Sequence, residues 1–220
     1  MNYLFVVAHC DDELLGCGAT LLDLIEKGNN VSVVCMTMEA PTREDPIANI
    51  MKSIHQKIGV QKTFIYPAKA LELEIYPRLD CVEFIENAIL DTQADCVFTH
   101  YKHDLHPDHR RVYELVMEAI RLPQRSPSKE INKIQQLLSF EVPCSTAWSD
   151  VSFNADCFFE ISQCNLDRKI NLVREYDNVL RNSPHPRSVS NIIALAKYRG
   201  SQCGCLYAES FINLFNLRLL

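Results

Sequence analysis

The first 120 residues alternate short apolar runs with longer amphipathic segments, and this alternation restricts the fold more than any other feature. The apolar runs have the length of buried strands and lie at 3–8, 31–36, 62–67 and 95–100. Segments with apolar residues at helical spacing follow each run, at 12–27, 46–58, 77–90 and 110–120. Parallel strands require such crossover helices, so the pattern predicts a doubly wound, mostly parallel sheet.

The second half of the chain is less regular. A polar, proline-containing linker at 122–130 precedes it. We expect strands at 137–142, 157–162 and 208–215, and helices at 165–180 and 188–200. A chain of 220 residues lies within the size of one α/β domain. We therefore predict a single-domain three-layer α/β/α sandwich, in which 1–121 form a Rossmann-like half and 130–220 an extension that completes a pocket.

Charge and hydropathy exclude several classes of protein. The formal net charge is −6 and the 22 basic residues are scattered, which argues against a nucleic-acid surface. No stretch has the roughly 18–20 apolar residues of a membrane span, and the N-terminus lacks the basic region of a signal peptide, so we expect a cytoplasmic protein. The ten cysteines include no CxxC pair, and several stand in strand-like runs, which favours buried thiols over disulfides or a zinc finger.

Acidic residues crowd the end of the first predicted strand. His9 is followed by Asp11, Asp12 and Glu13. Adjacent like charges repel and are costly to desolvate, so a cation is expected beside them. A second cluster, HPDH at 106–109, follows the fourth predicted strand. The carboxyl ends of parallel strands lie at one rim of the sheet, so both clusters are predicted to meet there.

Their side chains have the composition of a catalytic metal site. Zinc enzymes use three nitrogen or oxygen ligands and leave a position for water. His9, Asp12 and His109 can supply these ligands, with Asp104 and Asp108 as partners of the histidines. Taken separately, the acids could begin a helix and the histidines could be surface residues. Their predicted meeting on one rim favours the metal site.

The two clusters resemble the motifs of the PIG-L/LmbE-like family of zinc-dependent N-acetylglucosaminyl deacetylases. The family's A-H-P-D-D-E stands here as Ala8 to Glu13 with cysteine at position 10, and H-P-D-H is unaltered. Similarity extends through VFTH, FEVP, RKI, PHPRS, ALAKYRG and YAESF. The resemblance implies that Zn²⁺, or another divalent metal such as Fe²⁺, binds His9, Asp12 and His109. It also implies that Asp11 is the general base and that His106 stabilises the oxyanion, with Asp108 holding its ring.

Some positions depart from the family pattern. Cys10 replaces the usual proline, and a turn residue directed into the sheet is favoured over an extra ligand. The usual R-x-x-E after the second strand is missing, although Arg43 remains a candidate substrate-binding residue. His185 and Arg187 of PHPRS are further candidates, as residues of a lid, with a structural turn as the alternative. Trp148 could stack on a sugar, but a core or interface position is favoured.

These features predict a hydrolase that removes the acetyl group from an N-acetylglucosamine-type amino sugar or conjugate and releases acetate. Two alternatives stay open. One is a metal-dependent hydrolase of a non-sugar amide or ester, and the other is a metal- or sugar-binding protein without catalysis. Dinucleotide binding lacks support because no GxGxxG follows the first strand. The expected partner is a small molecule, and assembly into a homo-oligomer stays open.

Overall fold

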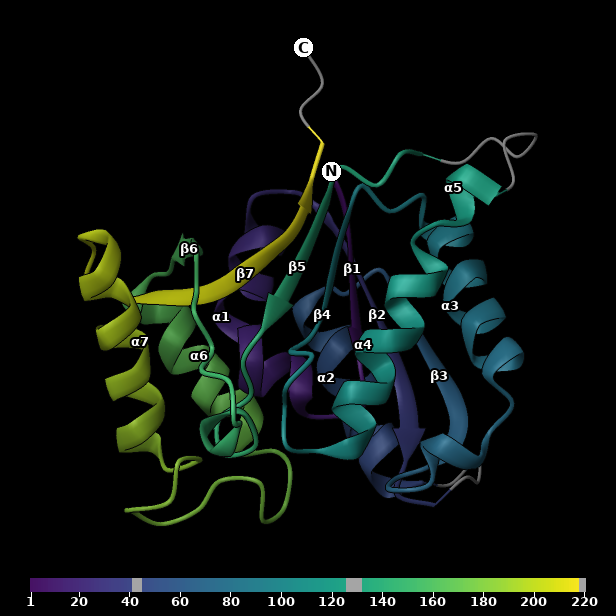
Figure 1. The fold of residues 1–220 in the computed structure, drawn as a ribbon. Helices are drawn as coiled ribbons and strands as arrows, with labels where there is room; N and C mark the ends of the chain where they lie inside the picture. The colour runs from purple at the N-terminus through teal and green to yellow at the C-terminus, as the bar shows by residue number, and fades with distance from the viewer. Residues whose placement is uncertain (41–44, 126–131, 218–220) are drawn as a thin grey trace.

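The computed structural model describes residues 1–40, 45–125 and 132–217. Within them, seven strands form one sheet in the order β3-β2-β1-β4-β5-β7-β6 (Figure 1). The strands are β1 (Asn2–Val7), β2 (Asn30–Met38), β3 (Lys62–Lys69), β4 (Cys96–His100), β5 (Gln136–Phe140), β6 (Cys157–Glu160) and β7 (Ala208–Asn216). Strands β1 to β5 are parallel to one another, whereas β7 runs antiparallel to β5 and β6. The predicted mostly parallel α/β sandwich is confirmed.

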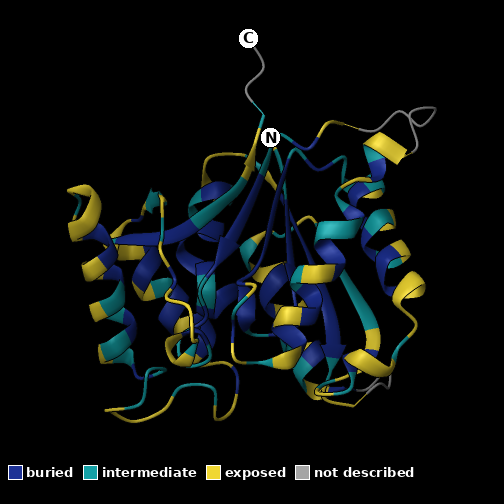
Figure 2. Ribbon diagram, viewed as in Figure 1, coloured by how far each residue is buried: buried dark blue, intermediate teal, exposed yellow. Residues whose placement is uncertain are grey.

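Helices cover both faces of this sheet. They are α1 (Asp12–Glu26), α2 (Pro46–Ile58), α3 (Arg78–Thr92), α4 (Pro107–Ala119), α5 (Leu122–Arg125), α6 (Gln163–Val173) and α7 (Val189–Cys203). In strand β1, residues 4–7 are all apolar and buried. Phe5 and Val7 pack into the core beneath α1 and α2, and Leu4 and Val6 pack into the core beneath α3 and α4. A parallel strand buried on both faces needs such a continuous apolar run (Figure 2).

Two predicted elements differ from those observed. The helix expected at 165–180 ends at Val173, because the chain turns inward at Tyr176, which is buried and donates its hydroxyl to the Cys10 carbonyl. The linker expected at 122–130 begins with the short helix α5, and its remainder lies outside the described residues. Among the helices described, none is long and apolar enough to cross a bilayer.

Helix α1 is interrupted at Cys17, whose φ of −144° and ψ of 28° are not helical. The amides of Ala19 and Thr20 donate to the carboxylate of Glu209 at 3.2 and 2.7 Å. Lys169 also donates to this carboxylate at 2.6 Å, and both ionic side chains are buried. Glu209 therefore caps the second segment of α1 from a distant strand, which amphipathic spacing in α1 could not predict.

Gly16, at the interruption, leaves space for the ring of Phe140. A Cβ atom at this position would lie 2.5 Å from Phe140 Cδ2 and 3.1 Å from the Glu141 carbonyl oxygen. We expect Gly16→Ala to lower the free energy of unfolding by about 1–3 kcal/mol through overpacking, measured by urea denaturation. Gly18→Ala is the control, because its Cβ would meet only the flexible stem of Lys169 and other side-chain atoms, nearest at 3.1 Å. Equal stability of the two variants would contradict the account.

Candidate metal centre

The candidate site residues gather where the parallel strands end, at the lower rim in Figure 1. His9, Asp11 and Asp12 stand at the turn from β1 into α1, and His100 is the last residue of β4. His106 and His109 follow β4 at the start of α4. This is the rim on which the sequence predicted that the two clusters meet.

Three ligand atoms form a nearly equilateral triangle. His9 Nδ1 lies 3.1 Å from Asp12 Oδ2, His109 Nε2 lies 3.2 Å from the same oxygen, and the two nitrogens are 3.2 Å apart. Ligand atoms about 2.0–2.1 Å from a tetrahedral zinc ion lie roughly 3.3 Å from one another. The spacing of these atoms therefore fits the three-ligand face of a tetrahedral zinc site.

Each histidine of the triangle is held by a carboxylate on its other nitrogen. His9 Nε2 lies 3.0 Å from Asp108 Oδ2, and His109 Nδ1 lies 3.2 Å from Asp104 Oδ2. Such contacts fix the tautomer and ring orientation of metal-binding histidines. These contacts agree with the prediction that Asp104 and Asp108 are partners of the histidines. The Asp108 carboxylate orients His9, however, and is not the group that contacts the His106 ring.

Groups that motif reasoning did not identify hold these two carboxylates. Asp104 Oδ2 accepts hydrogen bonds from the hydroxyls of Ser145 and Thr146, both at 2.9 Å. Asp108 Oδ2 accepts from the backbone amide of Leu71 at 2.7 Å. Leu71 lies in the loop after β3 with a φ of 67°, a conformation that costs a branched side chain energy. These contacts join distant loops, so only the tertiary structure reveals them.

A second trio, Asp12, His100 and His109, also lies close enough to hold a cation. His100 Nε2 already accepts the backbone N–H of Ala8 at 2.8 Å, however, so its lone pair is occupied. The ring instead stacks on His109 with centroids 3.9 Å apart. Asp12 Oδ1 is buried without a hydrogen-bond partner among the described residues, which leaves it available to a cation. The occupied lone pair of His100 thus favours the triangle of His9, Asp12 and His109 over this second trio.

Charge explains why the cluster attracts a cation. Burial disfavours protonation of His9 and His109, but Asp12 and the orienting carboxylates outweigh it and raise their pKa values to about 10 and about 9. Burial also acts on Asp12, yet the surrounding histidines hold its pKa well below the ordinary value. The carboxylates therefore require positive charge at His9 and His109. Protons can supply it, or a metal ion that replaces them.

Asp11 differs from Asp12 in what its side chain does. It is the N-cap residue of α1, but its carboxylate makes no capping hydrogen bond. The closest ionic contact is Arg187 Nη1, 3.7 Å from Asp11 Oδ2. Burial, with the Asp12 charge, raises the pKa of Asp11, whereas Arg187 lowers it. The carboxylate is thus free to accept a proton from a substrate or a water molecule.

His106 presents one ring nitrogen as a hydrogen-bond donor. As the N-cap residue of α4, it accepts the backbone N–H of Asp108 on Nδ1 at 3.2 Å. The neutral ring then carries its proton on Nε2. Burial, together with His9 and His109, lowers the pKa of His106 to about 4, so the ring is neutral at pH 7.

The candidate substrate-binding residues lie at different distances from this centre. Arg187 reaches Asp11, whereas His185 accepts the Arg187 amide at 3.0 Å and lies 3.9 Å from Cys144 Sγ. Arg43 lies outside the described residues. A cavity of about 230 Å³ opens beside the centre, with His9, Cys10, Asp11, Thr37, Met38, Glu39, Ile47, Ala70, Tyr176 and Val179 in its wall. This volume suits a small molecule.

Cys10 is buried and lies in the turn that the sequence predicted. Its sulfur is 3.4 Å from Cys35 Sγ and 3.8 Å from the Thr37 carbonyl oxygen. It therefore points into the sheet, and the interpretation of Cys10 as a turn residue agrees with these contacts.

Removing one orienting carboxylate tests the centre. We expect Asp104→Asn to weaken zinc binding by about 10–100-fold, because an amide orients the His109 ring less strongly. Competition with a chromophoric chelator measures this affinity. Asp91→Asn is the control, because Asp91 is exposed and pairs with Lys62. Unchanged affinity in Asp104→Asn would contradict the assignment of His109 as a ligand.

Comparison with known proteins identifies the sequence family that this chain matches. The sequence model of the PIG-L family, described as GlcNAc-PI de-N-acetylase, matches residues 4–120, just over half of the chain. The uncharacterized deacetylase YaiS of Escherichia coli (strain K12) is 29% identical over 170 residues, which span 73% of this chain and 82% of YaiS.

Solved structures share the whole fold. The N,N'-diacetylchitobiose deacetylase of Pyrococcus horikoshii superposes with a TM-score of 0.73 at 19% identity, over 96% of this chain and 83% of its own. GalB of Pseudomonas putida KT2440, a 4-carboxy-2-hydroxymuconate hydratase, superposes with a TM-score of 0.80 at 18% identity, over 100% of this chain and 98% of its own. The fold therefore occurs in proteins with different activities, and the site must decide the function.

Proposed function

The chain belongs to the PIG-L family, and on this basis we propose that it is a metal-dependent N-deacetylase. The proposed substrate is an N-acetylglucosamine-type amino sugar or a conjugate of one, and the products are the free amine and acetate. One observation carries the proposal most directly. The carboxylate of Asp11 makes no helix-capping hydrogen bond and belongs to the residue next to Asp12 of the triangle. A candidate base and a candidate three-ligand site therefore share one rim.

The residues fit a zinc ion. Two imidazoles and one carboxylate are a usual donor set for catalytic zinc, and their mutual spacing matches tetrahedral coordination. The same donors also suit Fe²⁺, so the donor set favours a divalent cation and zinc is the proposed metal. A bound zinc ion would polarise the amide carbonyl and lower the pKa of water.

The chain's own groups supply the remaining chemistry. Asp11 accepts a proton from the attacking water and later delivers it to the departing amine. Both steps are helped by a raised pKa of the Asp11 carboxyl, which burial supplies. His106 donates its Nε2–H to the oxygen that becomes negative in the transition state. Asp108 and Asp104 hold the rings of His9 and His109 and do not touch substrate.

Arg187 is the proposed substrate-binding residue with the clearest support. Its guanidinium is half-buried at the edge of the centre and has donors beyond those used by Asp11 and the Pro143 carbonyl. Such donors suit sugar hydroxyls. We expect Arg187→Ala to raise KM for acetate release by about tenfold, the effect of about one charge-assisted hydrogen bond. Steady-state kinetics measure this, and a fall in kcat alone would contradict a binding role.

A substrate panel tests the proposed function against its alternatives. The purified protein would be incubated with N-acetylglucosamine, its phosphates and glycosides, and with N-acetylated amino acids and acetate esters as non-sugar compounds. Acetate release from the amino sugars is the expected result. Release only from non-sugar amides or esters would assign another hydrolase, and metal binding without release from any compound would favour a binding protein.

A further inference from the structure

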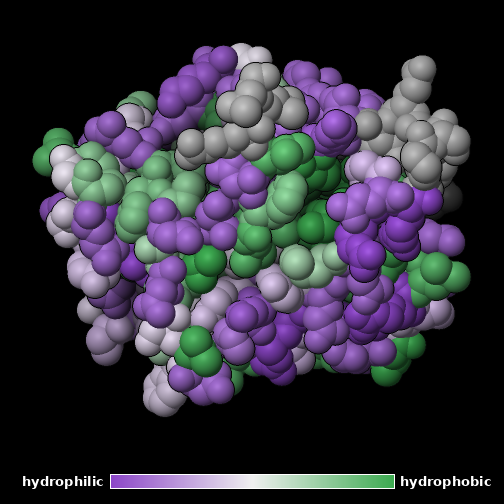
Figure 3. All heavy atoms as spheres, turned by 45° about the horizontal axis from the view of Figure 1, so that its top comes forward, coloured by the Kyte–Doolittle hydropathy of each residue, from purple (hydrophilic) through white to green (hydrophobic). Residues whose placement is uncertain are grey.

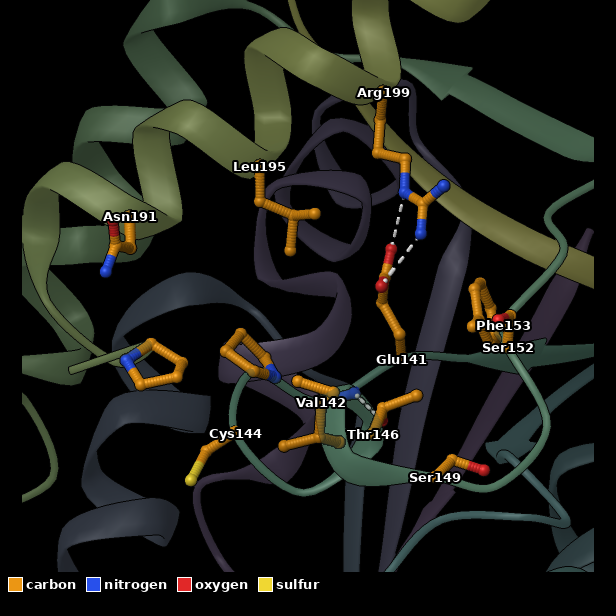
Figure 4. Close-up of a pocket in the computed structure, with 13 residues that line it drawn as sticks. Glu141, Val142, Cys144, Thr146, Ser149, Ser152, Phe153, Asn191, Leu195 and Arg199 are labelled. Atoms are coloured by element: carbon orange, nitrogen blue, oxygen red, sulfur yellow. Dashed lines mark hydrogen bonds and ion pairs between the residues drawn. The ribbon is translucent and has the colours of Figure 1, made fainter. Parts of the chain in front are cut away.

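A second cavity, of about 480 Å³, lies between α7 and the loop that follows β5 (Figure 4). Leu195 and Arg199 project into it from α7, opposite Val142 and Thr146 of the loop. Its wall comprises Glu141, Val142, Pro143, Cys144, Thr146, Ala147, Ser149, Ser152, Phe153, Pro186, Asn191, Leu195 and Arg199. Its wall includes none of the three proposed metal ligands, nor Asp11 or His106. We call it the α7 pocket.

The α7 pocket offers apolar surface without an unpaired charge. Glu141 and Arg199 form a two-point ion pair with distances of 2.7 and 2.9 Å, so each neutralises the other. The Arg199 guanidinium lies 5.7 Å from the ring centroid of Phe153. Pro143 and Leu195 add aliphatic surface. Such a wall suits an uncharged, largely apolar group better than an ionised one.

Arg187 stands between the α7 pocket and the metal centre. Its Nη1 approaches Asp11 Oδ2 at 3.7 Å, and its Nε donates to the carbonyl of Pro143 at 3.4 Å. Pro143 lines the α7 pocket. Thr146, another residue of the wall, donates to the carboxylate that orients His109. One molecule can therefore contact the centre and the α7 pocket together, on either side of Arg187.

Trp148 lies next to this pocket in the sequence. The residues on either side of it, Ala147 and Ser149, line the wall. Trp148 itself is 77% exposed, so of the core or interface position that the sequence favoured, the core is excluded. Its indole offers a flat, accessible face on which another ring can stack.

A third cavity, also of about 480 Å³, can be compared with the α7 pocket. It lies at the opposite rim of the sheet, where Figure 3 shows hydrophobic side chains gathered, and Ile120, Leu137 and Leu214 contribute to its wall. None of the described residues in its wall contacts the metal centre. Of these two larger cavities, the α7 pocket is the one whose described wall residues contact groups of the centre.

We propose that the α7 pocket binds an uncharged aromatic group attached to the amino sugar, so that the substrate is an aryl conjugate. The proposal rests on the proposed deacetylation, since it extends that substrate beyond its sugar. The sugar occupies the smaller cavity beside His9 and Asp11, Arg187 contacts it at the boundary, and the ring lies between Leu195 and Pro143.

Direct binding tests the proposal independently of catalysis. Trp148 is the only tryptophan of the chain, so the fluorescence reports on the surroundings of residue 148, between two residues of the wall. Zinc-loaded protein would be titrated with phenyl, methyl and octyl N-acetyl-β-glucosaminides and read immediately after mixing. We expect the phenyl glycoside to bind at least about tenfold more tightly than the methyl glycoside. In Leu195→Glu, which places a charge in the pocket, this ratio falls to about one.

Ala194→Glu is the matched control, because Ala194 is an exposed neighbour on the same helix and is not part of the wall. It is expected to keep the wild-type ratio. The proposal would be overturned if the phenyl glycoside did not bind, or if the ratio were near one in the wild type. An unchanged ratio in Leu195→Glu would also overturn it. Tighter binding of the octyl glycoside than of the phenyl glycoside would overturn the aromatic assignment. Acetate is measured in parallel. Its absence with all three glycosides would contradict the proposed function, while the binding ratios would still decide the role of the pocket.

Discussion

Asp11→Asn is expected to lower kcat for acetate release by about 10²–10⁴-fold, the usual contribution of a general base. An amide cannot accept the proton of the attacking water, and the Asp11 carboxylate has no capping hydrogen bond that would give it a structural role. The triangle of His9, Asp12 and His109 does not include this carboxylate. Zinc content should therefore stay at the wild-type value.

Steady-state kinetics and metal analysis of the same preparation measure both quantities. Asp91→Asn, at an exposed position, is the control for loss of a carboxylate. Retained activity in Asp11→Asn would remove Asp11 from the role of base. Loss of zinc together with activity would instead make Asp11 part of the metal site.

Lys169→Met is expected to lower the free energy of unfolding by about 3–5 kcal/mol, because it leaves the buried Glu209 carboxylate without a counterion. Glu209 keeps its hydrogen bonds from Ala19 and Thr20, but these amides do not carry a full charge. A loss of this size is a large part of the 5–15 kcal/mol that stabilises a typical protein.

Urea denaturation and thermal melting measure this loss. Lys57→Met is the matched control, since Lys57 pairs with Glu175 at the surface and its side chain is 64% exposed. Its removal should cost at most about 1 kcal/mol. Equal effects of the two substitutions would show that Lys169 and Glu209 contribute no more than a surface pair.

The parallel sheet could be predicted because its signals are local. β1 and β2 are apolar runs buried on both faces, and α2 begins at Pro46 and ends before Gly59, which has a φ of 93°. The interruption of α1 could not be predicted in this way. It depends on Phe140 and Glu209, which are distant in sequence and meet α1 only through the tertiary fold.

The candidate site also combines residues that the sequence could predict with residues that it could not. His9, Asp12, His106 and His109 stand at the ends of strands, so topology alone brings them to one rim. The partners of Asp104 could not be predicted, because Ser145 and Thr146 follow β5 and no spacing rule connects them to β4. The approach of Arg187 to Asp11 likewise depends on an irregular loop, and the sequence suggested only that this segment could reach the centre.

The most direct test of the account is to remove and restore the metal while acetate release is measured. The protein would be treated with a chelator, dialysed, and assayed on an N-acetylglucosamine glycoside before and after addition of one equivalent of zinc. The account predicts that activity is lost with the metal and returns as zinc binds with a stoichiometry of about one. Full activity of the chelated, metal-free protein would contradict the assignment of His9, Asp12 and His109 as the centre of catalysis.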